Sequence, residues 1–204
     1  IMESANIHSG IFMNGQVVFY RDQLVYSSEI PTETVEKFHQ MVKQDGYGLT
    51  AYNDKQFYLV ASSPGAKDAY GFIHSNPPAL NPDFYKENPI NMMLFISLPP
   101  AEEKYKVAFP NLDFLRNTPY SVDVISKGNS KAEGIKRFLE HLNQEDAKTY
   151  AFGDGPNDIE MLQAVSHPVA MGNALPILKE IAEFITTDNT NNGIVNGLKH
   201  YGLI

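Results

Sequence analysis

Three polar side chains able to bind a metal ion or a phosphate group lie within a dozen residues. They are Asp154, Asn157 and Asp158, in the stretch AFGDGPNDIEML, residues 151–162. A glycine stands on each side of Asp154, and glycine lets the main chain come close to a ligand. Mg²⁺ is bound by oxygen atoms, usually one or two carboxylates together with water and phosphate oxygens. The pattern therefore predicts a Mg²⁺ site at Asp154.

The residues that follow Asp154 favour an anion. Asn157 and Asp158 stand at the expected start of a helix, where free backbone N–H groups and the helix dipole attract negative charge. A second interpretation needs no ligand, because Asp154 and Asp158 are also of a residue type that caps helices. A calcium loop of the EF-hand type is not supported, because such a loop needs a glycine where this chain has Ile159.

Lys131 stands in the first turn of an expected helix, where a positive charge is unfavourable. In an exposed first turn the helix dipole opposes a cation by about 0.3–1 kcal/mol. A bound phosphate would reverse this, because the ammonium group would then donate hydrogen bonds to it. We therefore expect Lys131 to bind phosphate at the same place as Asp154. The alternative is a lysine that is only solvated.

The elements that must position these residues alternate between strand and helix in the last third of the chain. Strands are predicted at 120–126, 149–152 and 168–171. A helix follows Ser130, which forms a capping box with Glu133. Two more helices are predicted at 158–165 and from Pro176, the latter with Ile177, Leu178, Ile181 and Ile185 on one face. This order predicts a parallel, doubly wound sheet that binds ligands at the carboxyl ends of its strands.

The middle of the chain has a different pattern. We expect a helix at 31–44, a hairpin of strands 47–51 and 56–61, mostly loop at 62–83 and a strong strand at 90–98. Most of the tyrosine and phenylalanine residues lie between residues 28 and 118. The middle of the chain is predicted to be a separate α+β module, inserted after the strand-turn element at 11–19.

Composition limits the classes of function. The 204 residues carry a net charge of −8, with 16 scattered Lys and Arg residues, which argues against a nucleic-acid partner. No apolar run reaches the length of a membrane span. The chain has no Cys, which excludes thiol catalysis and thiolate metal sites and fits a cytoplasmic location.

Four segments taken together resemble the haloacid dehalogenase (HAD) superfamily, and most closely its Cof-type phosphatases. In order they are SKGNSKAEGI (126–135), FGDGPNDIEML (152–162), VAMGNA (169–174) and NGIVNGL (192–198). An earlier segment, FMNGQVVF (12–19), resembles the strand-turn element that precedes the family's inserted cap. The resemblance implies an α/β fold: a Rossmann-like core at 1–27 and 119–204, incomplete at its start, with an α+β cap at 28–118.

The resemblance also implies a function and a role for each site residue. The family hydrolyses phosphate monoesters with Mg²⁺ through an aspartyl-phosphate intermediate. By position, Asp154 would bind the metal ion, Asp158 would support the site or touch the metal, and Asn157 would bind the phosphoryl group. Lys131 would neutralise the phosphate. The implied partner is a small phosphorylated metabolite, with sugar phosphates as the leading class.

One feature of the family is missing from the sequence. The nucleophile and the acid–base residue form an Asp-x-Asp pair, and no such pair occurs in these 204 residues. The Ser or Thr that binds phosphate ahead of the cap is also absent. We therefore expect a piece of a longer protein, inactive by itself, with half a metal site and an unpaired sheet edge. Two other functions stay open: a non-catalytic binding module, and a phosphotransferase or mutase.

Overall fold

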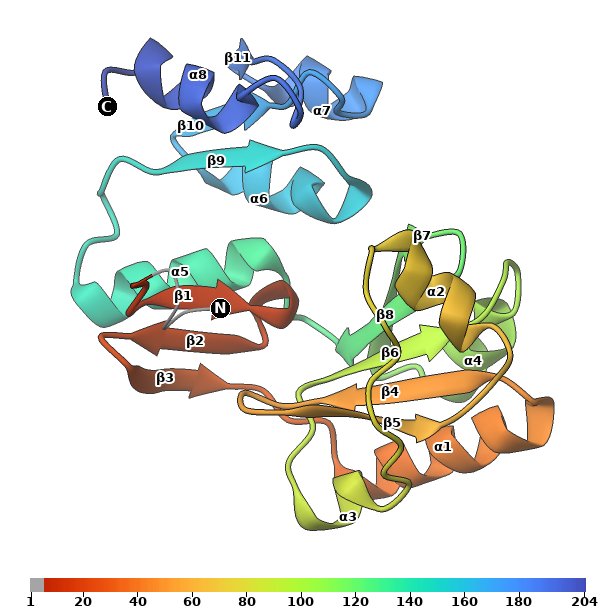
Figure 1. Ribbon diagram of the computed structural model, residues 1–204. Helices are drawn as coiled ribbons and strands as arrows, with labels where there is room; N and C mark the ends of the chain where they lie inside the picture. Colours follow the sequence, from red (N-terminus) through yellow and green to blue (C-terminus); the bar gives the residue numbers. More distant parts are fainter. Residues whose placement is uncertain (1–5) are drawn as a thin grey trace. The chain divides into compact units, whose positions relative to one another are not determined.

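The computed structural model describes residues 6–204, and the chain divides into two compact units (Figure 1). The first unit combines the residues up to Val25 with Ser130–Ile204, and the second is Tyr26–Asn129. The second unit is therefore an insertion within the first. Each unit has its own sheets and its own apolar clusters.

The second unit is built on a five-stranded antiparallel sheet. Its order is β5-β4-β6-β8-β7. The strands are β4 (Gly48–Tyr52), β5 (Phe57–Ala61), β6 (Met92–Ile96), β7 (Leu112–Thr118) and β8 (Ser121–Ser126). The expected hairpin and the strong central strand are thereby confirmed as β4, β5 and β6.

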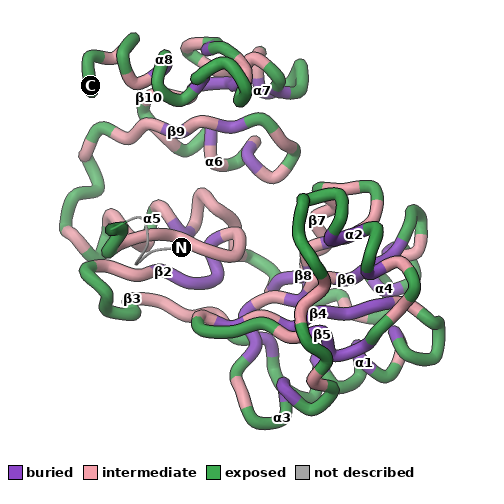
Figure 2. Tube along the Cα trace, in the orientation of Figure 1, coloured by how far each residue is buried: buried purple, intermediate pink, exposed green. Residues whose placement is uncertain are grey.

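Helices cover both faces of this sheet. On one face, α1 (Thr32–Asp45) and α4 (Glu102–Ala108) meet an aromatic core in which Phe38 contacts Phe95 and Tyr105 at ring-centroid distances of 5.6 and 5.0 Å. On the other face, α2 (Ala66–Phe72) packs on alternate residues of the same strands. A short helix, α3 (Phe84–Glu87), follows the loop after α2. Figure 2 shows the buried residues of this unit along β4, β6 and α1.

One sequence-based expectation for this region is wrong. Residues 120–126 were expected in the parallel sheet, but β8 pairs antiparallel with β6 and β7. Its alternating pattern marks a strand without specifying the partner, because both kinds of sheet accept it. β8 belongs to the compact unit that ends at Asn129. Residues 62–83 are mostly loop, as expected, and contain the short helix α2.

The first unit contains two small sheets. The antiparallel pair β1 (Gly10–Phe12) and β2 (Val17–Tyr20) is joined by the turn η2 (Met13–Gly15), and β3 (Gln23–Ser27) extends this sheet. The other sheet is parallel with the order β11-β10-β9. Its strands are β9 (Tyr150–Gly153), β10 (His167–Ala170) and β11 (Phe184–Ile185). The prediction of parallel strands is confirmed for β9 and β10.

Helices of the first unit follow the expected order. They are α5 (Lys131–Leu142), α6 (Ile159–Ala164), α7 (Pro176–Ile181) and α8 (Gly193–His200). Ser130 caps α5 by accepting the N–H of Glu133 at 3.3 Å, and Pro176 begins α7, both as predicted. Ile185 is not part of α7 but lies in β11. Among the described residues, no helix has the length and apolar character needed to cross a membrane.

Two glycines bring α5 against the turn η2. A Cβ on Gly134 would lie 2.5 Å from Cγ2 of Ile11 and 3.0 Å from Cα of Gly15. Gly15 itself has φ +88°, and a Cβ there would lie 2.0 Å from the carbonyl oxygen of Ser130. Gly134 is the one buried residue of α5. The start of α5, and with it Lys131, is therefore positioned by direct backbone contact.

This contact predicts that Gly134→Ala destabilises the protein. Helix propensity alone favours Ala over Gly by about 1 kcal/mol, but the clash with backbone at Gly15 cannot relax and should cost about 1–3 kcal/mol net. The matched control is Gly71→Ala in α2, where a Cβ meets no atom within 4 Å. Urea unfolding, monitored by circular dichroism, should show a lower free energy of unfolding for Gly134→Ala and no decrease for Gly71→Ala. Equal midpoints for the two variants would contradict the packing argument.

A buried histidine makes the second unit sensitive to acid. His39 is 6% exposed and its Nδ1 lies 3.2 Å from the hydroxyl of Tyr85, while Nε2 has no partner among the described residues. Burial, and then the charge of Lys43, lowers the pKa of His39 below the usual value for histidine. The unfolded chain therefore binds a proton more readily than the folded one as the pH falls below about 6.5.

Stability should consequently decrease as the pH falls below the ordinary pKa of histidine, and His39→Gln should reduce this dependence. The control is His74→Asn, at an exposed position with φ 55° that Asn accepts. Thermal unfolding midpoints between pH 7 and pH 5 provide the measurement. A slope that is the same in His39→Gln and in the unchanged protein would show that His39 is not responsible.

Candidate functional site

The acidic loop lies at the carboxyl end of a parallel strand. β9 ends at Gly153, and the chain turns through Asp154 and Gly155 into the short 3₁₀ helix η3 (Pro156–Asp158) and then α6. A Cβ on Gly153 would lie 2.7 Å from Cβ of Asp158, so this glycine is required for the turn to close. Hydrogen bonds from Met171 N to Gly153 O (3.0 Å) and from Leu175 N to Asp154 O (3.2 Å) tie the loop to the segment after β10. The position is the one expected for a ligand site in a parallel sheet.

Asp158 connects the main elements of the site. Its carboxylate is buried, with 8% of the side chain exposed. Oδ1 accepts a hydrogen bond from Nζ of Lys131, and Oδ2 accepts the backbone N–H groups of Asp154 at 3.0 Å and Gly155 at 3.1 Å. Burial raises the pKa of this carboxyl, but the hydrogen bonds from Lys131 and the two N–H groups outweigh it and hold the pKa below its usual value. Asp158 is therefore the fixed anion of the site.

Lys131 is paired, so the alternative of a merely solvated lysine is wrong. It is the first residue of α5, and its ion pair with Asp158 offsets the unfavourable helix dipole at that position. The side chain is still 30% exposed. An ammonium group has three N–H donors, so donors remain for a second anion after the hydrogen bond to Asp158. Lys131 and the backbone of Asp154 bind the same carboxylate, so they lie on the same side of the unit.

The Asp154 side chain is exposed and oriented by an asparagine. Its Oδ2 accepts a hydrogen bond of 2.8 Å from Nδ2 of Asn173, whose own Oδ1 accepts the N–H of Asn189 at 3.1 Å. Within residues 6–204, the other oxygen, Oδ1, has no hydrogen-bond partner. Asn173 lies in the segment 169–174, but its contact with Asp154 could not be predicted from the sequence, because the two residues are in loops that follow different strands.

Asn157 is held by a second asparagine. Its Nδ2 donates to Oδ1 of Asn14 at 3.1 Å, and Asn14 has φ 55° in the turn η2. The sequence signals this turn through Asn14-Gly15 but not its contact with Asn157, 143 residues away. The turn η2 therefore contributes to the site from the start of the chain.

The helix-capping alternative is correct only for Asp158. That residue reaches back to the N–H of Gly155, the N-cap of η3, in the manner of a capping box. Asp154 precedes the N-cap and its carboxylate bonds Asn173 instead. Because Asp154 is not engaged as a cap, its free oxygen is available to a ligand.

The two carboxylates of the site differ in how far protein donors occupy them within the described residues. Among the described residues, no three His, Asp or Glu side chains come together to hold a metal ion. Both oxygens of Asp158 are occupied by protein donors, whereas Oδ1 of Asp154 is not. Mg²⁺ usually takes only one or two protein carboxylates and completes its shell with water and phosphate. Asp154 therefore fits an Mg²⁺ ligand better than Asp158 does.

The fold and the site define a mixed α/β core with an inserted α+β unit and a Lys131–Asp158 ion pair next to the exposed carboxylate of Asp154. A family model for haloacid dehalogenase-like hydrolases matches residues 1–198, and the chain belongs to this family. Its relatives place it in the Cof-type branch, subclass IIB.

Individual relatives support the same assignment. The chain is 36% identical over 205 residues to the "Putative phosphatase YkrA" of Bacillus subtilis (strain 168), covering all of this chain and 79% of YkrA. A crystal structure from Geobacillus kaustophilus HTA426 has a TM-score of 0.88 at 32% identity, over all of this chain and 80% of the other. The subclass IIB sugar phosphatase BT4131 has a TM-score of 0.84 at 27% identity, over all of this chain and 79% of the other.

The central role of Asp158 gives a prediction about stability. Asp158→Asn leaves Lys131 without its anion and should lower the free energy of unfolding by about 2–3 kcal/mol at pH 7. The depressed pKa means that Asp158 stabilises the folded state above pH about 4 and loses this effect as the pH falls through its lower folded-state value. The difference between the two proteins should therefore shrink at pH 3, as measured by urea unfolding. The control is Glu160→Gln, an exposed acid on α6. A difference that does not change with pH would contradict the assignment.

Proposed function

We propose that this protein contributes the phosphate-binding and metal-binding residues of an Mg²⁺-dependent phosphatase. The substrate class is a small phosphorylated metabolite, with sugar phosphates first, as the subclass IIB sugar phosphatase among the similar structures suggests. The observation that carries the proposal is the single buried carboxylate of Asp158. It holds the Lys131 ammonium and the backbone beside Asp154 at one place.

Lys131 is proposed to bind the phosphoryl group. Its ammonium group is held in place by the hydrogen bond to Asp158, and its remaining N–H donors can bind phosphate oxygens. Asn157 is proposed to add a neutral donor, because its Nδ2 carries two hydrogens and Asn14 accepts only one of them. Positioned donors of this kind stabilise the charge that develops in phosphoryl transfer.

Asp154 is proposed to hold Mg²⁺ through Oδ1, with Asn173 fixing the carboxylate through Oδ2. The ion would neutralise phosphate charge when bound. We assign Asp158 to the support of Lys131 and not to the metal ion, because its oxygens already accept three protein hydrogen bonds.

The nucleophile is the residue that these 204 positions do not provide. The family's reaction passes through an aspartyl-phosphate, formed on an Asp-x-Asp pair, and no two aspartates here are separated by one residue. Catalysis is therefore to be assayed in a chain that carries this pair. We propose that the 204-residue chain by itself binds phosphate but releases none from an ester, and that the Tyr26–Asn129 unit serves as the cap that selects the leaving group.

The test is phosphate release from a panel of sugar phosphates and other metabolites by the chain that carries the pair. Lys131→Met and Asp154→Asn should each lower kcat/KM by about 10²–10³-fold, the typical loss when a charge-stabilising group is removed. Lys136→Met, on an exposed position of the same helix α5, is the matched control and should keep full activity. EDTA should abolish turnover and Mg²⁺ should restore it.

The other functions give different results in the same assay. Transfer of the phosphoryl group to a second sugar, in place of water, would show a phosphotransferase or mutase. No release from any phosphate ester, with Mg²⁺ and the Asp-x-Asp pair present, would refute the phosphatase and favour a binding module. For the 204-residue chain, ³¹P NMR of orthophosphate with Mg²⁺ should show binding that Lys131→Met weakens.

A further inference from the structure

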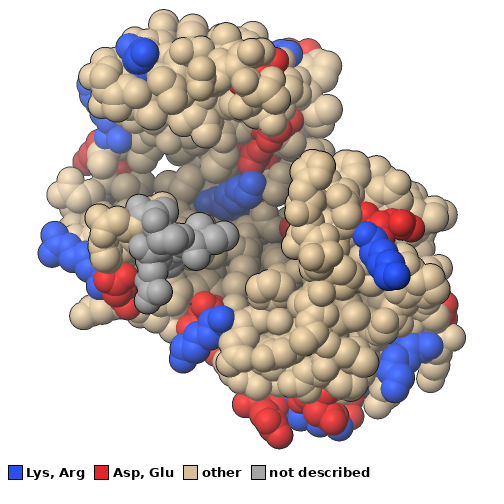
Figure 3. Space-filling model, viewed as in Figure 1, with Lys and Arg blue, Asp and Glu red and all other residues tan. Residues whose placement is uncertain are grey.

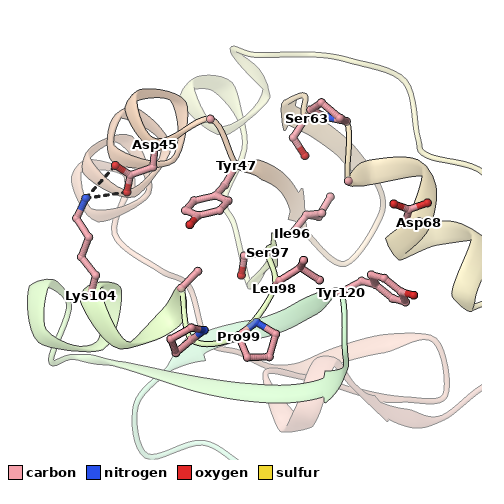
Figure 4. A pocket seen from close by; sticks show the side chains of 15 residues that line it. Asp45, Tyr47, Ser63, Asp68, Ile96, Ser97, Leu98, Pro99, Lys104 and Tyr120 are labelled. Atoms are coloured by element: carbon pink, nitrogen blue, oxygen red, sulfur yellow. Dashed lines mark hydrogen bonds and ion pairs between the residues drawn. The ribbon is translucent and has the colours of Figure 1, made fainter.

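The second unit contains a pocket that the phosphatase residues do not use. Its volume is about 690 Å³, within the range of small-molecule sites. All of its lining residues lie between Asp45 and Tyr120, so it is formed by the second unit alone. Figure 4 shows side chains from several segments surrounding one open space.

The sheet register explains why these segments meet. Gly48 pairs with Ile96, and Ile96 pairs with Ser121, so the chain before β4, the chain after β6 and the β7–β8 turn lie at one end of the sheet. Leu49 pairs with Ala61, which brings the β5–α2 connection to the same end. Four loops therefore converge on the pocket, and a convergence of loops at a sheet end is a common place for ligand sites.

The pocket carries one uncompensated negative charge. At one end, Asp45 accepts two hydrogen bonds from Nζ of Lys104, at 2.8 and 2.9 Å, and one from the hydroxyl of Tyr105 at 2.8 Å. The negative charge of Asp45 is therefore balanced by the positive charge of Lys104. At the other end in Figure 4 lies Asp68, an exposed carboxylate that has no partner within residues 6–204. The lining thus contains two carboxylates and one ammonium group.

The space between the two ends is apolar and aromatic. The rings of Tyr47 and Tyr120 flank Ile96 and Leu98 in Figure 4. Tyr47 is held by an edge contact with Phe95 at 5.4 Å, and Tyr120 by Phe72 at 5.7 Å. Their orientation is therefore set by packing before any ligand arrives. Tyrosine faces attract cations through the ring quadrupole.

We propose that this pocket binds a small protonated organic amine with an apolar or aromatic body. The ammonium group would lie at Asp68, and the body would pack between Tyr47 and Tyr120 over Leu98. An anionic ligand does not fit, because Asp45 already neutralises the one ammonium group of the lining and Asp68 repels a second anion. The phosphorylated substrate of the proposed function is therefore excluded as the occupant.

A series of three ligands of similar shape and different charge tests this. The ligands are 2-phenylethylamine (a cation at pH 7), 2-phenylethanol (neutral) and 3-phenylpropionate (an anion), titrated into the ¹⁵N-labelled 204-residue chain. The amine should shift the amide signals of Gly46, Gly65 and Ala101 with a Kd of about 1 mM, a usual affinity for a fragment of this size. The alcohol should bind roughly fivefold more weakly and the anion should not bind.

Variants locate the site. Asp68→Asn should weaken the binding of the amine by roughly threefold to tenfold and leave the binding of the alcohol unchanged. Tyr120→Leu should weaken the binding of the amine by about fivefold. The matched control for charge is Glu87→Gln, an exposed acid outside the pocket, which should change nothing. No saturable shift up to about 10 mM amine, equal binding of amine and alcohol, or an unchanged Kd in Asp68→Asn would each overturn the proposal. Because the titration needs neither Mg²⁺ nor phosphate release, its outcome is independent of the phosphatase assay.

Discussion

The buried carboxylate of Asp158 is the interaction on which the candidate site depends. It lies 27 residues from Lys131 in the sequence, yet it accepts the lysine's hydrogen bond and the N–H groups of the Asp154 turn. A charge buried in this way is costly unless every lone pair has a partner. Asp158 accepts hydrogen bonds from two separate segments, α5 and the loop after β9. The folded state therefore positions the Lys131 ammonium group and the Asp154 turn together. Oδ1 of Asp154 takes part in no helix cap or ion pair within the described residues, so it is available to a ligand.

Close backbone contacts at three glycines allow these side chains to come together. Gly134 and Gly15 let α5 lie directly on the turn η2, and Gly153 lets the loop after β9 close on Asp158. Each of these positions forbids a side chain for a steric reason that is specific to its neighbour. The same contacts bring Asn14 to Asn157. The first unit therefore positions polar side chains with main-chain packing, whereas the second unit gains its stability from an aromatic core around Phe38.

The two units differ in the charge that they offer to a ligand. The first presents Lys131 beside an exposed acid, a combination suited to a phosphate group with a metal ion. The second presents tyrosine rings and the unpaired Asp68, a combination suited to an organic cation. On the face that Figure 3 shows, the described Lys, Arg, Asp and Glu residues are interspersed. The ligand chemistry therefore follows from a few local groups.

The sequence by itself predicted Asp154, Asn157, Asp158 and Lys131 as candidate site residues, because they stand in short segments whose glycines and helix starts have local physical meaning. It also determined the elements with clear periodicity, such as α1, α5, β6 and β9. Only the tertiary structure decided that β8 pairs antiparallel in the inserted unit, and that the carboxylate of Asp158 accepts hydrogen bonds from Lys131 and from the backbone of Asp154 and Gly155. Asn14 and Asn173 likewise became part of the site only on folding. The reason is physical: local pattern fixes the conformation of a segment, whereas strand partners and carboxylate ligands are chosen by contacts between segments far apart in the chain.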